Sequence, residues 1–316
     1  MQIGGHLRTI LPTLWANVWS PSEPLGTVPW RGSVEDSQHG TLPLGGQYHD
    51  LRAADSLVVI VHGLGGSPDS FYTKKAATEA ARAGFSSLRL ALRGADGLAA
   101  DIYHAGLTDD LLAAIAAPEF RRYRSVFVLG YSMGGNQTLV LASQTPPPRL
   151  AAVAAACAPV DLGASGRHLD ESRRFIYRYW ILRSLKQHYA SVESRRKMAL
   201  PSSAVKSLGT FREWDAQTVV PRFGFRDVDS YYDFASAKKR LAELTTPSLL
   251  VMTEDDPIVA AAACRPVLRD IPEALDLRWL PHGGHLGFPR GLDLGFSPRL
   301  GFESQVMAFF ARHRNE

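Results

Sequence analysis

The sequence predicts an α/β fold built on a mostly parallel β-sheet with helices on both faces. Short apolar runs recur along the chain, helix patterns separate them, and one long stretch without a strand pattern interrupts this alternation. A strand covered on both faces is an unbroken apolar run, and such runs alternating with helices indicate a parallel sheet. The 316 residues suffice for a single domain of this kind, residues 1–316, with an insertion.

The first part of the alternation follows an N-terminal arm and the first strands, which we place in residues 1–50. The apolar runs that predict buried strands are residues 56–63, 85–92, 125–130 and 150–159. A helix over residues 69–84 would end at Gly84, because a residue without a Cβ suits the end of a helix. A second helix would begin at Thr108, an N-cap residue type that acidic residues follow in the first turn.

The alternation then stops. Residues 163–244 are rich in Arg, Tyr and Trp and contain no strand pattern, so we expect a helical cap inserted after the sixth strand. The longest helix pattern in this segment places Phe175, Tyr179 and Leu182 along one apolar stripe. Residues 245–316 resume the alternation and complete the core with two strands and a final helix.

Composition and charge exclude several classes of function. The 35 basic and 31 acidic residues give a net charge of +4 without a concentrated basic stripe, so we expect no nucleic-acid partner. Cys157 and Cys264 lie in apolar surroundings, which favours a reducing compartment, the cytoplasm, over a disulfide framework. The N-terminal arm is too broken for the roughly 20 apolar residues of a membrane span. We expect it to pack on the protein, with weak peripheral membrane contact as the alternative.

The central motif is GYSMG at residues 130–134, between an apolar strand run and a helix pattern. A G-x-S-x-G turn between a strand and a helix is a nucleophile elbow, in which small residues allow a sharp bend that exposes the serine at the carboxyl edge of the sheet. The helix start and the amide of Met133 would stabilise negative charge on an attacked carbonyl. The alternative is a glycine-rich turn with a capping serine. We interpret Ser132 as a nucleophile.

A serine nucleophile needs a base, and the base needs a carboxylate that orients it. On a sheet of this kind the order along the chain is Ser, acid, His, with each residue after a strand. The segment EDDP supplies the acid, for which we prefer Asp256 over Asp255. The segment HGGH follows the next strand, and we prefer His285 over His282 because the preceding glycines let the imidazole approach Ser132 closely.

A second backbone N–H group should stabilise the negative charge beside that of Met133. The loop HGLGG after an early strand places the amide of Leu64 in the position expected for this donor. We interpret His62 in the same loop as structural. Neither a His-Glu-x-x-His motif nor paired Cys/His spacing occurs in the sequence, so we expect no metal site.

Together these residues resemble the AB-hydrolase family 4 branch of the α/β-hydrolase fold, which holds YheT-like hydrolases and yeast medium-chain fatty-acid ethyl-ester synthase/esterases. The similarity covers nearly the whole chain. Its segments are GGHLRTILP, HGLGGSPDSFY, RGADG, YHAGLTDDL, GYSMGGN, FREWDAQTVVPRFGFRDVDSYYDFAS, EDDP and GGHLGF. Arg8 stands where Gln is usual, and Trp214 where Phe is usual. The resemblance implies hydrolysis of carboxylic esters, sometimes with acyl transfer to an alcohol, by a triad of Ser132, Asp256 and His285 without a cofactor.

The cap would shape the site for the acyl group. Trp180, Phe211 and Trp214 favour an apolar acyl chain, which the resemblance implies is short to medium, unless these residues only pack the cap onto the core. The basic side chains of the cap form a solvated face or attract acyl-CoA phosphates or an anionic bilayer; they are Arg173, Arg174, Arg178, Arg183, Lys186, Arg195, Arg196 and Lys197. Two other functions stay open: an acyltransferase that moves an acyl group from acyl-CoA or an ester to an alcohol, and a non-catalytic α/β-hydrolase scaffold. The sequence does not determine the oligomeric state.

Overall fold

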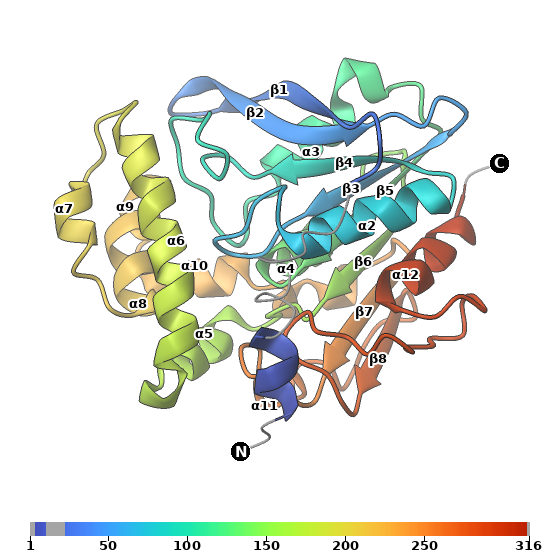
Figure 1. The fold of residues 1–316 in the computed structure, drawn as a ribbon. Coiled ribbons are helices and arrows are strands. Elements are labelled where there is room, and N and C mark those ends of the chain that lie inside the picture. The colour runs from blue at the N-terminus through green and yellow to red at the C-terminus, as the bar shows by residue number, and fades with distance from the viewer. Residues whose placement is uncertain (1–3, 11–22, 315–316) are drawn as a thin grey trace.

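The computed structural model describes residues 4–10 and 23–314. These residues form one eight-stranded sheet with helices packed around it (Figure 1). The strand order is β1-β2-β4-β3-β5-β6-β7-β8. Strands β3 to β8 run parallel, whereas β2 pairs antiparallel with β1 and β4. The strands are β1 (Val28–Asp36), β2 (Gly40–His49), β3 (Ser56–Val61), β4 (Ser86–Ala91), β5 (Ser125–Tyr131), β6 (Leu150–Ala156), β7 (Ser248–Thr253) and β8 (Leu275–Leu280). The predicted α/β fold with a mostly parallel sheet is confirmed.

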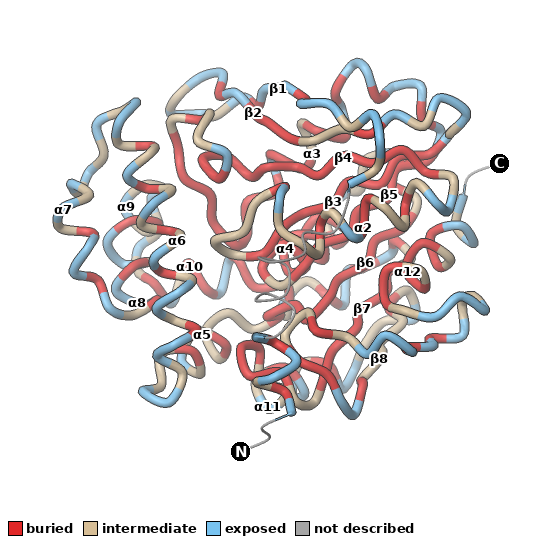
Figure 2. The backbone as a smooth tube through the Cα atoms, in the orientation of Figure 1, coloured by how far each residue is buried: buried red, intermediate tan, exposed pale blue. Residues whose placement is uncertain are grey.

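The inner strands are apolar because both of their faces are covered. Every residue of β3, β4, β5 and β7 is buried, and Figure 2 shows this continuous burial along the centre of the sheet. In β3, Leu57 and Val59 face one cluster of the core, whereas Val58 and Ile60 face the other. This alternation follows from the two-residue period of a strand.

Helices cover both faces of the sheet. Helices α2 and α12 pack on the face of Val58 and Ile60, and α3 and α4 supply side chains to the opposite cluster. The helices of this core are α2 (Phe71–Arg82), α3 (Asp109–Ala116), η1 (Pro118–Phe120), α4 (Met133–Ala142), α11 (Ala261–Cys264) and α12 (Phe302–Ala311).

Two predicted helix ends differ in their outcome. Gly84 follows α2 with φ +81°, a left-handed conformation that glycine adopts without strain. Thr108 directly precedes α3, but its hydroxyl makes no capping hydrogen bond and donates instead to Gln144 Oε1 at 3.1 Å. The backbone of Thr108 is near-helical (φ −102°, ψ −9°), whereas a capping residue is usually extended. Thr108 thus occupies the predicted N-cap position, but its side chain does not cap α3.

The segment between β6 and β7 consists of helices and lies to one side of the sheet in Figure 1. We call this segment, residues 162–243, the cap. Its elements are α5 (Leu162–Asp170), η2 (Ser172–Arg174), α6 (Phe175–Glu193), α7 (Ser202–Val205), α8 (Phe211–Trp214), η3 (Asp215–Val219), α9 (Val220–Phe223), α10 (Val228–Ala235), η4 (Ala237–Lys239) and η5 (Leu241–Glu243). The element η3 is a π-helical turn.

The apolar stripe predicted for α6 is only partly buried. Leu182 is buried, but Phe175 and Tyr179 are 60% and 57% exposed. The buried face of α6 continues through Leu185 and Tyr189 instead. In the first turn of this 19-residue helix Tyr177 is buried instead of Phe175, so the buried stripe begins at a different residue from the one predicted.

A buried charge network fastens the cap to the core. Arg93 donates from Nε to Asp110 Oδ1 at 2.8 Å, and both side chains have no exposed surface. Arg93 also lies 2.9 Å from Asp36 and 3.3 Å from Asp101. Arg222 of α9 bonds to the same two carboxylates at 2.9 and 2.5 Å. The network therefore links β1, the loop after β4 and the cap.

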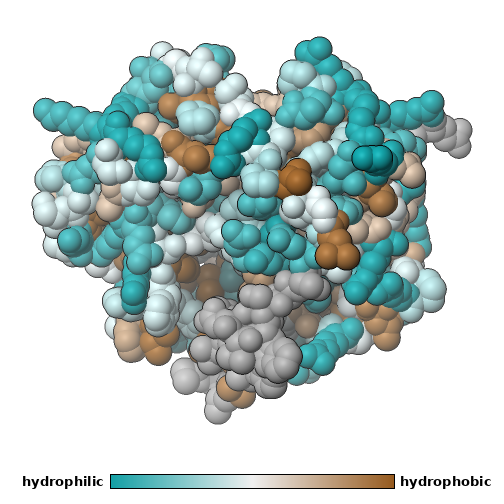
Figure 3. All heavy atoms as spheres, turned by 45° about the horizontal axis from the view of Figure 1, so that its top comes forward, coloured by the Kyte–Doolittle hydropathy of each residue, from teal (hydrophilic) through white to brown (hydrophobic). Residues whose placement is uncertain are grey.

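The outer surface is mostly polar on the face drawn in Figure 3, where hydrophobic side chains are scattered among hydrophilic ones. No helix within residues 4–10 and 23–314 is long and apolar enough to cross a membrane.

Arg222→Met should lower the free energy of unfolding by about 3–5 kcal/mol, because it removes a largely buried partner from the buried carboxylate of Asp101 and the largely buried carboxylate of Asp36. Urea denaturation measures this change. Arg212→Met is the matched control: Arg212 also pairs with an aspartate of the cap, Asp229, but both side chains are exposed. Its effect should stay below about 1 kcal/mol. Equal losses in the two variants would contradict the role assigned to the network.

Candidate active site

Ser132 lies at the turn from β5 to α4 in a strained backbone conformation. Its φ is +53° and its ψ is −120°, a region that residues with a Cβ rarely adopt. The Ser132 N–H donates to Ala156 O at 2.8 Å, which fixes the turn to the end of β6. The serine thus lies at the carboxyl edge of the parallel strands, as the G-x-S-x-G pattern predicts.

The glycines of this turn are required by close packing. A Cβ at residue 130 would lie 2.2 Å from Gly134 O, and one at residue 134 would lie 2.5 Å from His62 O. Both distances are too short for any Cβ, so these two positions accept only glycine without movement of the backbone. Gly134 therefore brings the start of α4 directly against the loop after β3.

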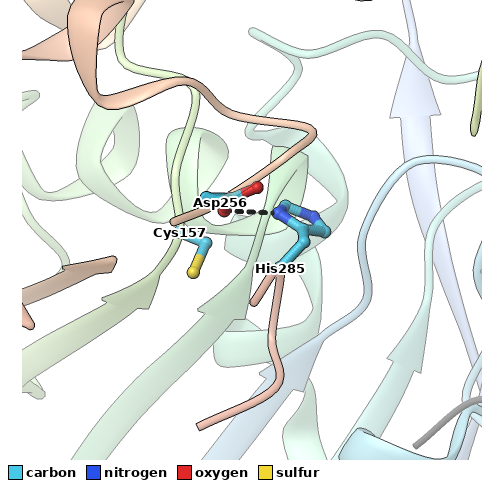
Figure 4. A group of neighbouring side chains, drawn as sticks. All are labelled: Cys157, Asp256 and His285. Atoms are coloured by element: carbon cyan, nitrogen blue, oxygen red, sulfur yellow. Dashed lines mark hydrogen bonds and ion pairs between the residues drawn. The ribbon is translucent and has the colours of Figure 1, made fainter. Parts of the chain in front are cut away.

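Asp256 and His285 form a hydrogen-bonded pair. Asp256 follows β7 and His285 follows β8, and Asp256 Oδ2 lies 2.8 Å from His285 Nδ1 (Figure 4). The other oxygen, Oδ1, accepts from the N–H groups of Ile258 and Val259 at 2.8 and 2.9 Å. The Asp256 side chain is 1% exposed and that of His285 is 10% exposed. The carboxylate is thus fixed on one side by the backbone and orients the imidazole on the other.

The alternative acid and histidine form a separate pair. Asp255 Oδ2 lies 3.2 Å from His282 Nδ1, and the His282 side chain is 71% exposed. The structure therefore groups the four candidate residues as Asp256 with His285 and Asp255 with His282, and the preferred pair is the buried one.

Ser132 and His285 are not joined by a hydrogen bond within the described part of the chain. They are connected through the end of β6: Ser132 bonds to Ala156, and the thiol of the next residue, Cys157, lies beside Asp256 and His285. Hydrogen bonds between a catalytic base and its partner are often long without a substrate and tighten when one binds. The role of Ser132, Asp256 and His285 as a triad stays a prediction.

The loop after β3 lies against the serine turn. A Cβ at Gly63 would lie 3.2 Å from Ser132 Cβ, so the next residue, Leu64, is close to the serine. Neither the Leu64 nor the Met133 N–H bonds to an acceptor within residues 4–10 and 23–314. Both residues line the same cavity as Ser132. Their predicted role as donors to an oxyanion stays a prediction.

His62 holds this loop as a structural residue. Its Nδ1 lies 2.8 Å from Gly63 O, and its Nε2 accepts from Leu92 N at 3.3 Å. Complete burial lowers the pKa of His62 to about 4, so the ring is neutral near pH 7, with the proton on Nδ1. The Gly63 N–H, in turn, donates to Tyr72 Oη at 3.1 Å.

Cys157 completes a cluster with Asp256 and His285 whose donor atoms lie within 4.8 Å of one another (Figure 4). Burial, and secondarily the Asp256 charge, raises the pKa of the Cys157 thiol well above its ordinary value. A cysteine binds a metal ion as the thiolate, not as the thiol. Both oxygens of Asp256 already accept hydrogen bonds. The cluster therefore suits a protonated thiol beside an acid–base pair better than a metal ion.

The N-terminal helical segment, residues 4–10, packs on the histidine loop. Thr9 Oγ1 accepts from the His285 N–H at 2.8 Å and donates to Gly5 O at 2.8 Å. A Cβ at Gly284 would lie 2.6 Å from Thr9 N, and one at Gly287 would lie 1.9 Å from Arg8 O. No pattern in the sequence singles out Thr9; the available signal is the group of glycines that flanks His285. The prediction of a packed arm also includes residues 11–22, which lie outside the described residues.

A mostly apolar cavity of about 110 Å³ lies between Ser132 and the cap. Among its lining residues are Leu64, Ser132, Met133, Ser165, Ile181, Leu185, His188, Tyr189, Phe211, Trp214, Asp215, Val219, Tyr231, Tyr232, Ile258 and Val259. The buried aromatic residues Phe211 and Trp214 thus have the predicted location, whereas Trp180 is 59% exposed and does not line the cavity. The assignment of Trp180 to the acyl site is wrong, because the first residue of α6 that lines the cavity is its neighbour, Ile181.

The basic side chains of α6 are largely engaged in local contacts. Arg178 donates to the carbonyls of Leu169 and Glu171 at 3.0 and 3.1 Å. Lys186 donates to two other carbonyls of the cap at 2.9 and 2.6 Å. Arg183 lies 5.5 Å from the ring of Trp180. These contacts involve three of the eight basic side chains, and the alternatives of a solvated face and an anion-binding face stay predictions.

Comparison with known proteins assigns a family. Residues 58–293 match the alpha/beta hydrolase family. YheT of Escherichia coli (strain K12), a protein named as an esterase, is 26% identical over 319 aligned residues, 95% of this chain and 88% of YheT. The monoacylglycerol lipase of Saccharomyces cerevisiae is 25% identical over 74% of this chain and 55% of the lipase, so the chain spans little more than half of that protein.

A solved structure shares the fold. A Pyrococcus furiosus esterase superposes with a TM-score of 0.59 and 14% identity, covering 93% of this chain and 100% of the esterase. At 14% sequence identity, this similarity shows a shared fold and nothing about activity.

Thr9→Val should loosen the histidine loop, because valine keeps the shape of threonine but cannot accept the hydrogen bond of the His285 N–H. We expect roughly tenfold faster hydrogen–deuterium exchange in the peptide that contains residues 283–287, as the loss of about 1–2 kcal/mol predicts. Thr9→Ser keeps the acceptor and is the control. Unchanged exchange in Thr9→Val would contradict the contact.

Proposed function

The chain belongs to the alpha/beta hydrolase family, and from this we propose that it hydrolyses carboxylic esters with Ser132 as nucleophile, His285 as base and Asp256 as orienting acid. The observation that carries the proposal is the strained serine turn, which opens into a mostly apolar cavity. The Asp256–His285 pair follows β7 and β8 at the same carboxyl edge of the sheet, outside the residues that line this cavity. The similarity to proteins named as an esterase and a lipase supports the same chemistry.

The first half of the reaction forms an acyl-enzyme. His285 Nε2 accepts the proton of Ser132 Oγ while Oγ attacks the ester carbonyl carbon, and the electrons of the carbonyl π bond move to its oxygen. The N–H groups of Leu64 and Met133 stabilise this oxyanion. The intermediate then collapses, the bond to the alcohol oxygen breaks, and His285 gives its proton to the leaving alcohol.

The second half regenerates the serine. A water molecule attacks the acyl-enzyme while His285 accepts its proton, and the carboxylic acid leaves as the proton returns to Ser132. Asp256 stays ionised throughout and stabilises the imidazolium through Nδ1. Its bonds to the amides of Ile258 and Val259 support this role, because they fix the carboxylate before any substrate binds.

The cavity supports an apolar acyl group of short to medium length. Its lining is mostly aliphatic and aromatic, and its volume of about 110 Å³ is small compared with the roughly 300–1,000 Å³ of sites for drug-sized ligands.

Two alternatives differ from this proposal in one step each. An acyltransferase would use an alcohol instead of water against the acyl-enzyme. A non-catalytic scaffold would not form the acyl-enzyme at all, and the fixed acid–histidine pair counts against it.

Two further predictions concern the surroundings of the protein. The buried free thiols of Cys157 and Cys264 support a reducing compartment, for which we propose the cytoplasm. Weak contact with a membrane surface, through the N-terminal arm or the basic side chains of the cap, stays a prediction.

Ser132→Ala should abolish labelling by a fluorophosphonate probe and lower kcat for a p-nitrophenyl ester on the order of 10⁶-fold. Asp256→Asn should lower kcat about 10⁴-fold, since the imidazole loses its orientation. Asp255→Asn is the matched control and should retain activity. Labelling of Ser132→Ala at the wild-type level would refute the nucleophile, and a loss in Asp255→Asn instead of Asp256→Asn would reverse the choice of acid.

A series of p-nitrophenyl esters from acetate to palmitate should show highest kcat/KM for short to medium chains, because the cavity is small. Product analysis with added ethanol should give mainly free acid rather than ethyl ester. Equal kcat/KM across the series would contradict a defined acyl site, and predominant ethyl ester would establish the acyltransferase.

A further inference from the structure

One buried hydroxyl in the cavity has no partner. Ser165 of α5 lines the cavity, is 4% exposed, and its Oγ makes no hydrogen bond within the described residues. A serine in a helix can satisfy its hydroxyl at the carbonyl four residues earlier, but Asp161 O accepts only the Ser165 N–H here. A buried hydroxyl without a hydrogen bond costs about 1–3 kcal/mol. The position therefore favours a ligand group that accepts this bond.

A carboxyl group in the same cavity is also incompletely bonded. Asp215 opens the π-helical turn η3, and such turns occur frequently at functional sites. Its Oδ2 accepts from Tyr232 Oη at 2.7 Å, whereas Oδ1 has no bonded partner among residues 4–10 and 23–314. Burial raises the pKa of Asp215 to about 7, and the neighbouring Asp170 charge raises it further. A leucine at position 215 would fill a similar space without the free-energy cost of burying a carboxyl group.

The two groups belong to one corner of the cap. Asp170 at the end of α5 accepts from the N–H groups of Phe211 and Arg212 at 2.8 and 3.2 Å, which fixes α5 beside α8 and the adjoining η3. A Cβ at Gly166, next to Ser165, would lie 3.4 Å from Tyr232 Oη. The donor of Ser165 and the free acceptor of Asp215 therefore come from neighbouring elements, while Ser132 enters the cavity from the core.

We propose that Ser165, Asp215 and Tyr232 bind a hydroxyl group of the substrate, so that the enzyme selects esters that carry a hydroxyl away from the ester bond. This inference rests on the proposed ester hydrolysis at Ser132. A hydroxyl matches the pair because it accepts one hydrogen bond, from Ser165 Oγ, and donates one, to Asp215 Oδ1. An ammonium group can donate to Asp215 and to the lone pairs of Ser165 Oγ, but it accepts no hydrogen bond, so the Ser165 O–H would still have no acceptor.

The test compares esters that differ only in the hydroxyl. The hydroxyl lies on the acyl side in ethyl 3-hydroxyhexanoate and ethyl 6-hydroxyhexanoate, and their plain reference is ethyl hexanoate. It lies on the alcohol side in monohexanoylglycerol, and the plain reference there is propyl hexanoate. Ethyl 6-aminohexanoate tests a cation. We expect kcat/KM to favour at least one hydroxylated ester by roughly tenfold or more, the effect of one or two hydrogen bonds in a buried site.

Substitutions connect this selectivity to the cluster. In Asp215→Leu the ratio of kcat/KM between the hydroxylated and the plain ester should fall to about one, and in Ser165→Ala it should fall to an intermediate value. Asp229→Leu and Ser207→Ala alter exposed residues of the same types in the cap and should keep the wild-type ratio. The ratio compares two substrates of one preparation, so a variant that folds poorly still reports selectivity.

The outcomes separate this inference from the proposed function. Hydrolysis of plain and hydroxylated esters at equal rates, or a preference for the amine, overturns the hydroxyl site and leaves the esterase intact. If the wild type hydrolyses none of these esters, calorimetry of the same compounds with Ser132→Ala measures whether the hydroxylated esters bind more tightly than the plain ones. Tighter binding of a hydroxylated ester supports the site although the proposed reaction has failed, whereas equal or absent binding overturns both.

Discussion

The hydrogen bond between Asp256 and His285 is the contact on which the rest of the site depends. Each partner is held from a different direction. The backbone N–H groups of Ile258 and Val259 fix the carboxylate, and Thr9 of the N-terminal segment fixes the backbone of the histidine. The pair is thus preorganised by the loop after β7 and by the N-terminal segment. In the proposed reaction, a histidine that is oriented before the substrate binds has no reorganisation to undergo.

Backbone strain concentrates around this pair. Among the described residues, the non-glycine positions with positive φ are Ser132, Cys157 and Leu286, at +53°, +49° and +59°. They are the serine at the elbow, the residue whose thiol lies beside Asp256, and the neighbour of His285. Such conformations cost on the order of 1–3 kcal/mol each and persist where the surrounding structure fixes them. Here the close packing of β5, β6 and the N-terminal segment supplies that constraint.

The cap contributes both walls and polarity to the cavity. Arg222 ties it to the core through Asp36 and Asp101, and Ser184 of α6 donates to Gly65 O at 2.6 Å, in the loop that carries Leu64. The same cap brings Ser165 and Asp215 to a mostly apolar space. A hydrophobic cavity alone discriminates weakly between similar substrates, whereas a buried polar group that needs a partner discriminates strongly. The cap is therefore the part of the fold that would determine the substrate.

The sequence by itself determined the sheet, its helices and the candidates for catalysis, because these follow from local patterns. Buried strands are unbroken apolar runs, and a serine between glycines after such a run has one common structural meaning. The sequence could rank but not separate Asp256 from Asp255, or His285 from His282, since neighbouring residues share the same pattern. Tertiary structure separated them by burial and pairing. It also showed that Phe175 and Trp180 are exposed, that Thr9 supports His285, and that Ser165 and Asp215 lie in one cavity. These relations join residues far apart in the chain, and their contacts exist only after the sheet has brought the segments together.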